Sequence, residues 1–138
     1  MQGCCRLALM CACNDLLFLR YGWGHAPGDG TGLTDCFQLV CEVRRRLGLR
    51  DYAPDFDWVY DTYTEATLPR MRLMRWLLEH CSRVTTPQPG DLLLCQGRAA
   101  GAFAVVSAEG GMIHLRDSGT VAHQQRVPSV LPLFRPLP

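Results

Sequence analysis

The sequence predicts one α+β domain over residues 1–138, on three observations. A chain of 138 residues has the length of a single domain with its own hydrophobic core. Apolar residues recur at three- and four-residue spacing up to about Ser82, and from Pro87 onward they form short runs divided by turns. Helices followed by an antiparallel sheet make an α+β arrangement, and 48% apolar with 20% charged residues excludes a disordered or fibrous chain.

The first half is predicted to hold three helices. The first covers residues 7–18 and leads into a loop over 21–32 that is rich in glycine. The second begins at Cys36 after a cap at Thr34 or Asp35, and Gly48 closes it. Residues 51–67 are expected to form an irregular packed crossing. A third helix then runs from Pro69 to about Ser82, and its apolar face is expected to hold Met71, Met74, Leu78 and Cys81.

The second half is predicted to be an antiparallel meander. Pro87-Gln88-Pro89-Gly90 is a turn, and the segments Glu109-Gly110-Gly111 and Asp117-Ser118-Gly119 are hairpin turns between apolar runs. The strands are expected at 91–95, 102–107, 112–116, 120–127 and 130–134.

Charge and cysteine spacing exclude several kinds of partner. Fourteen arginines against 13 acids leave a net charge of +1, so no field gathers nucleic acid or anionic lipid. The eight cysteines are irregularly spaced, and most are expected to be reduced; neither a metal site nor a cofactor is predicted. No apolar run reaches the roughly 18 residues of a membrane span, and the short run 7–13 is interpreted as helix and not as a signal peptide.

Cys36 carries the strongest chemical signal, because it opens a helix directly after the glycine-rich loop. Unpaired N–H groups and a partial positive charge at a helix N-terminus favour a thiolate. A cysteine there is placed as a nucleophile, although a buried structural cysteine gives the same pattern.

Five motifs resemble those of the NlpC-type cell-wall peptidases, a branch of the papain-like cysteine peptidases. The resemblance covers about Leu16 to Phe134. It is closest to the short single-domain versions encoded in bacteriophage tail operons, on Tyr52-Ala53-Pro54-Asp55 and the closing Phe134. The motifs are Tyr21-x-Trp23-Gly24, Asp35-Cys36, Leu39-Val40, Pro89-Gly90-Asp91-Leu92 and Met112-Ile113-His114.

The resemblance implies roles for particular residues. Cys36, preceded by Asp35, would attack the amide of a peptidoglycan stem peptide, Tyr21 would help to hold the oxyanion, and His114 would orient the base. The base itself would fall at Ala102, which has no imidazole. His25, in the loop before Cys36, is the candidate substitute.

The resulting expectation is a degenerate NlpC-type domain in a phage tail tip or baseplate, with a structural role and lost catalysis. Its partners would be other tail hub proteins and its location the virion. Two alternatives stay open: an active peptidoglycan endopeptidase with a displaced base, and a thiol acyltransferase on the same scaffold. A positioned base contributes about 10²–10⁴-fold to the reaction rate. Its absence at Ala102 therefore favours the degenerate domain.

Overall fold

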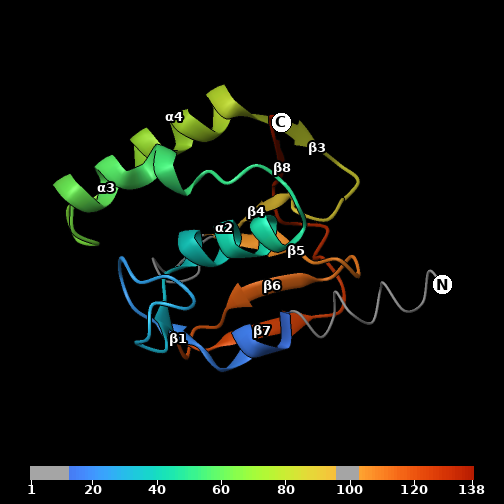
Figure 1. Cartoon of the computed structure of the whole chain (residues 1–138). Helices are drawn as coiled ribbons and strands as arrows, with labels where there is room; N and C mark the ends of the chain where they lie inside the picture. The colour runs from blue at the N-terminus through green and yellow to red at the C-terminus, as the bar shows by residue number, and fades with distance from the viewer. Residues whose placement is uncertain (1–12, 96–102) are drawn as a thin grey trace.

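The computed structural model describes residues 13–95 and 103–138 (Figure 1). It confirms the α+β class, with helices in the first half and an antiparallel sheet in the second. Residues 7–12 of the first expected helix, the loop 96–101 and Ala102 lie outside the described residues.

The described residues form a six-stranded sheet in the order β3-β8-β4-β5-β6-β7, with every pairing antiparallel. Strands β4 to β7 make the predicted meander. Strand β8 returns across the sheet to lie between β3 and β4, and β3 takes residues expected at the end of a helix. The strands are β3 Cys81–Val84, β4 Leu92–Leu94, β5 Phe103–Val106, β6 Met112–Leu115, β7 Val121–Gln124 and β8 Leu133–Pro136.

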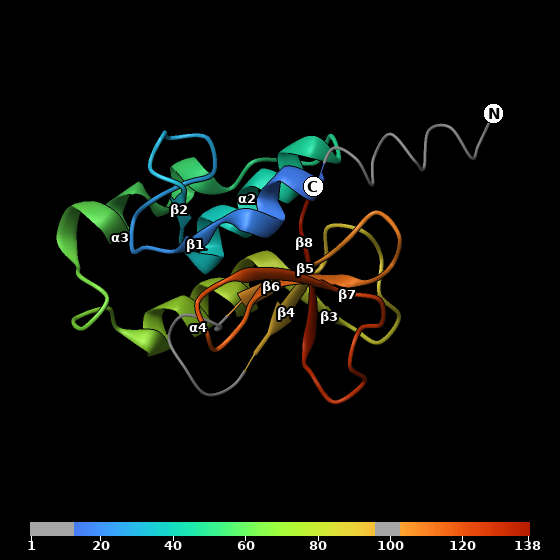
Figure 2. The same ribbon diagram turned by 90° about the horizontal axis from the view of Figure 1, so that it is seen from below.

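Helix α2 (Cys36–Arg46) matches the prediction closely. The Asp35 side chain accepts a hydrogen bond from the backbone N–H of Gln38 and caps the helix, and Gly48 follows it with φ of 75°. The helix lies on the same side of the sheet as residues 15–21 (Figure 2). Its buried stripe meets inward residues of the strands in the main core, which includes Cys36, Leu39, Val40, Val43, Leu92, Phe103, Val105, Ile113 and Leu115.

A second, smaller core lies on the opposite face of the sheet. Alternate residues of a strand point to opposite faces, so the neighbours of the main-core residues gather here. They are Leu93, Ala104, Val106, Met112 and Leu133, with Val84, Cys95, Val127 and Leu131 packed around them. The two cores divide each central strand into residues that face α2 and residues that face away.

One expectation for the middle of the chain is wrong and another is half right. Residues 51–67 contain two short helices, η2 (Ala53–Phe56) and α3 (Asp57–Thr62). Helix α4 (Arg70–His80) buries Leu77, and Met74 and Cys81 of the expected face pack against the main core, whereas Met71 and Leu78 are 80% and 70% exposed. Tertiary contacts with the aromatic side chains of η2 determine which face of α4 packs. The ring of Trp76 lies edge-to-face against the ring of Phe56, with their centroids 4.5 Å apart.

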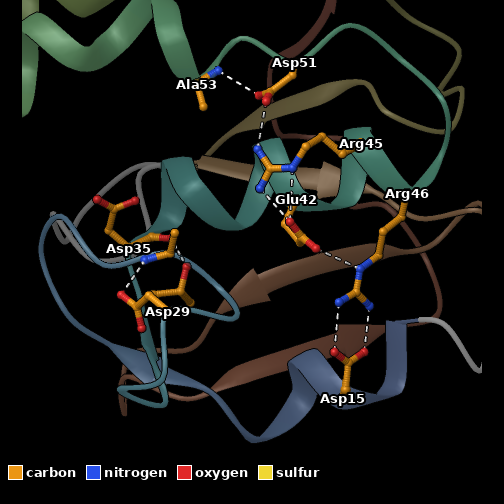
Figure 3. A network of polar contacts seen from close by, with 10 residues as sticks. Asp15, Asp29, Asp35, Glu42, Arg45, Arg46, Asp51 and Ala53 are labelled. Carbon is orange, nitrogen blue, oxygen red and sulfur yellow. Dashed lines mark hydrogen bonds and ion pairs between the residues drawn. The ribbon is translucent and has the colours of Figure 1, made fainter.

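The N-terminal segment is tied to α2 by ion pairs (Figure 3). After η1 (Asp15–Phe18), the chain forms β1 (Arg20–Tyr21), which pairs in parallel with β2 (Leu33–Thr34) across the glycine-rich loop. Arg46 donates to both carboxylate oxygens of Asp15, at 2.6 and 2.8 Å, and also to Glu42 at 3.2 Å. This holds η1 beside the C-terminal end of α2.

Candidate functional site

Cys36 is the first residue of α2, and its side chain lies in the main core with only 8% exposed. Burial, and to a smaller extent the Asp35 charge, raise the pKa of the Cys36 thiol to about 12. A hydrogen bond from the Phe103 backbone favours the thiolate but does not compensate. The expected lowering of the pKa by the helix N-terminus is therefore wrong, because loss of hydration outweighs the helix field.

Asp35 is 2% exposed and organises the residues around the sulfur. Its Oδ1 accepts from the backbone N–H of Gln38 at 2.7 Å. Its Oδ2 accepts from the backbone N–H of Gly24 at 3.0 Å and from the hydroxyl of Tyr60 at 2.7 Å. Burial raises the pKa of Asp35, and these hydrogen bonds oppose the rise. Tyr60 carries no motif signal, so sequence reasoning missed it.

Tyr21 in β1 pairs with Thr34, the residue before Asp35, and packs against the main core that holds Cys36. Burial raises the Tyr21 pKa, and the Glu65 carboxylate raises it further, so the phenol stays protonated and can donate. The structure thus brings Tyr21, Asp35 and Cys36 into one region of the fold.

His114 does not join them. In β6, Ile113 and Leu115 belong to the main core with Cys36, whereas Met112 belongs to the core on the opposite face. Alternation along the strand places His114 with Met112, facing away from α2. Burial lowers the pKa of the half-buried ring, so its neutral form is favoured. The orienting role expected for His114 is therefore wrong.

The sheet position facing the sulfur belongs to Phe103. Phe103 and Val105 lie in the main core with Cys36, and Ala104 lies on the opposite face. Ala102, which the motif alignment places at the base position, lies outside the described residues. The described part of β5, Phe103–Val106, thus packs in the same buried core as the sulfur and holds no side chain that could act as a base.

His25 is held within the glycine-rich loop. Its Nδ1 lies 3.0 Å from Asp29 Oδ2, and Asp29 also accepts from the backbone N–H and hydroxyl of Thr31. Hydrogen bonds to Thr31, with smaller contributions from His25 and Ala26, lower the pKa of Asp29. No hydrogen bond among the described residues joins the His25 ring to Cys36.

A serine–histidine pair lies elsewhere, at the end of the β5–β6 hairpin. Ser107 Oγ lies 3.1 Å from His123 Nε2, and Glu109 lies 3.9 Å from the same nitrogen. In a catalytic triad the acid contacts the other ring nitrogen, and the serine is accessible. Ser107 is buried, and its hydroxyl also accepts from the backbone N–H of Gly111. The group anchors a hairpin.

Metal and membrane features do not arise in the part of the chain that the structure covers. No cluster of three or more His, Cys, Asp or Glu side chains there could hold an ion. None of its helices combines the length and apolar character needed to cross a bilayer.

Comparison of the chain with protein-family models, curated proteins and solved structures found no match. The inference of function therefore depends on the motifs and on the geometry around Cys36.

Proposed function

We propose that the chain is a catalytically silent domain of the NlpC type, with a papain-like fold, that serves as an assembly module of a phage tail tip or baseplate. The motif resemblance supports the ancestry. A cysteine at the start of a helix packed on an antiparallel sheet, beside Tyr21 and Asp35, is compatible with it.

The observation that carries the proposal is the burial of the Cys36 thiol against Phe103. With a pKa of about 12, roughly one molecule in 10⁵ holds a thiolate at pH 7, against a few per cent for an ordinary cysteine. A missing base removes a further factor of about 10²–10⁴. These losses together leave little of the rate that a cysteine peptidase achieves.

The thiol prediction is tested by alkylation with iodoacetamide between pH 6 and 11, followed by peptide-resolved mass spectrometry. The rate at Cys36 is expected to rise about tenfold per pH unit without a plateau below pH 10, because the pKa is about 12. The urea-unfolded chain is the control and should level off near pH 9. A plateau below pH 8 in the folded protein would refute the proposal.

Catalysis is tested on purified peptidoglycan stem peptides. Wild type and Cys36→Ala are expected to give the same background turnover. Cleavage lost in Cys36→Ala would instead establish an endopeptidase. A thioester on Cys36, trapped with an acyl donor and lost in the same variant, would establish the acyltransferase.

Assembly is tested separately, by mass spectrometry of purified phage particles and by binding of the purified chain to an isolated tail hub complex. The chain is expected in the particles at a fixed ratio to the hub. Its absence from intact particles would contradict the assembly role, whatever the state of the thiol.

A further inference from the structure

We propose that residues 53–62, which form η2 and α3, are a built-in cover over the N-terminal end of α2, held closed by the hydrogen bond between Tyr60 and Asp35. The inference rests on the proposed function, because it identifies what keeps the sulfur of a silent site unreactive. The segment 53–62 is called the cover below.

The polar part of the closure is made by the Tyr60 side chain. The Tyr60 hydroxyl, from α3, donates to Asp35 Oδ2 at 2.7 Å. Asp35 cannot follow a moving partner, since Gln38 and Gly24 fix its two oxygens from the backbone. A bond to this carboxylate therefore ties α3 directly to the residue before Cys36.

The apolar part lies on the other side of the cysteine. The ring of Phe37, the residue after Cys36, lies 3.8 Å from the ring of Phe56 in η2, measured between centroids. Phe37 also meets Phe103 edge-on at 6.4 Å. The cover thus contacts both sequence neighbours of Cys36, and the sheet closes the site from below.

The glycine-rich loop is held by the same tyrosine. The rings of Trp23 and Tyr60 lie 5.2 Å apart, and the Tyr60 ring also contacts the position of Gly24. Tyr60 therefore joins three separate segments: the loop, the cap of α2 and the cover. Removing its hydroxyl alone should loosen the cover without opening a cavity, because phenylalanine keeps the ring.

The test compares two cysteines of one helix in one molecule. Cys41 lies in α2 with Cys36, is buried, and has a pKa also raised to about 12, and within the described residues it is not among the hydrogen-bond and ring partners of Tyr60. In Tyr60→Phe, the rate of iodoacetamide labelling of Cys36 relative to Cys41 at pH 8 is expected to rise at least about tenfold. Losing one hydrogen bond to a charged group should increase the population of molecules with an open cover by about that factor.

Tyr63→Phe is the matched control, because its hydroxyl, at the end of the same helix, contacts Arg72 at 3.1 Å and lies outside the closure. It should leave the ratio unchanged. An unchanged ratio in Tyr60→Phe overturns the proposal that residues 53–62 cover Cys36. This includes an equal rise at both cysteines, because such a rise reports global unfolding. Hydrolysis by the wild type would overturn the proposed function and leave this ratio interpretable.

Discussion

Replacing Arg44 by methionine probes a buried cation that forms no ion pair within the part of the chain that the structure describes. Arg44 is 5% exposed, and its Nη1 donates to the carbonyl of Gly90 at 2.8 Å. Its Nε donates to the carbonyl of Arg50 at 3.3 Å, and its guanidinium lies 5.3 Å from the ring of Tyr52. The side chain therefore joins the end of α2 to two loops.

The size of the effect follows from what methionine leaves behind. The buried carbonyl of Gly90 loses its donor, which costs about 1–3 kcal/mol, whereas Arg50 is exposed and its carbonyl can bind water. Loss of the contact with Tyr52 adds about 0.5–1 kcal/mol. Burial lowers the pKa of Arg44, so removing its charge returns part of this. The net loss of unfolding free energy is expected to be about 2 kcal/mol, or roughly 6–8 °C in Tm.

Urea and thermal unfolding, followed by circular dichroism, measure the change, with Arg45→Met as the control. Arg45 is the next residue of the same helix, but it lies at the surface and pairs with Glu42 and Asp51. Arg45→Met should lower the unfolding free energy by less than about 1 kcal/mol, and by less still at high salt. The reasoning is refuted if Arg44→Met destabilises the protein no more than Arg45→Met does.

Three further outcomes are expected. Burial lowers the pKa of His114 in the folded state, so the unfolded chain binds the proton first and stability is lost as pH falls below about 7. His114→Gln should weaken this pH dependence, measured as urea midpoints at pH 8, 6.5 and 5. The same dependence in both proteins would contradict it. Arg46→Ala should speed proteolysis near Asp15, because it removes the paired hydrogen bonds between the two residues. Salt weakens the same ion pair in the wild type, so the difference in cleavage rate between the two proteins should shrink at high salt, and equal rates at low salt would contradict this. Gly48→Ala should lower unfolding free energy by about 1 kcal/mol, since φ there is 75°, and an unchanged midpoint would count against this.

The run Arg44, Arg45 and Arg46 illustrates what sequence can and cannot specify. All three suit the last turn of a helix, and α2 does end there. Their environments nevertheless differ: one is buried on backbone carbonyls, one is at the surface, and one holds the N-terminal segment. Helical periodicity gives the angle of each side chain around the axis, but which loops return to meet it depends on segments far away in the chain.

The candidate site divides in the same way. Asp35 and Cys36 were predictable because a cap and a buried stripe are local patterns, and the structure places both as expected. His114 was misplaced because the motif alignment does not define a strand's register on the sheet, and a shift of one residue moves a side chain to the opposite face. The Tyr60 contact with Asp35 spans 25 residues and leaves no periodic signal.

Phe103→His tests that account of the register. Since Phe103 lies in the main core with Cys36, an imidazole there would face the sulfur. An imidazolium within about 4–6 Å should lower the pKa of the thiol by roughly 1–3 pH units from its value of about 12. The pH profile of Cys36 alkylation measures the shift. Ala102→His, at the position that the motif alignment selects, is the comparison. A shift in Ala102→His without one in Phe103→His would place the lost base where the motifs put it.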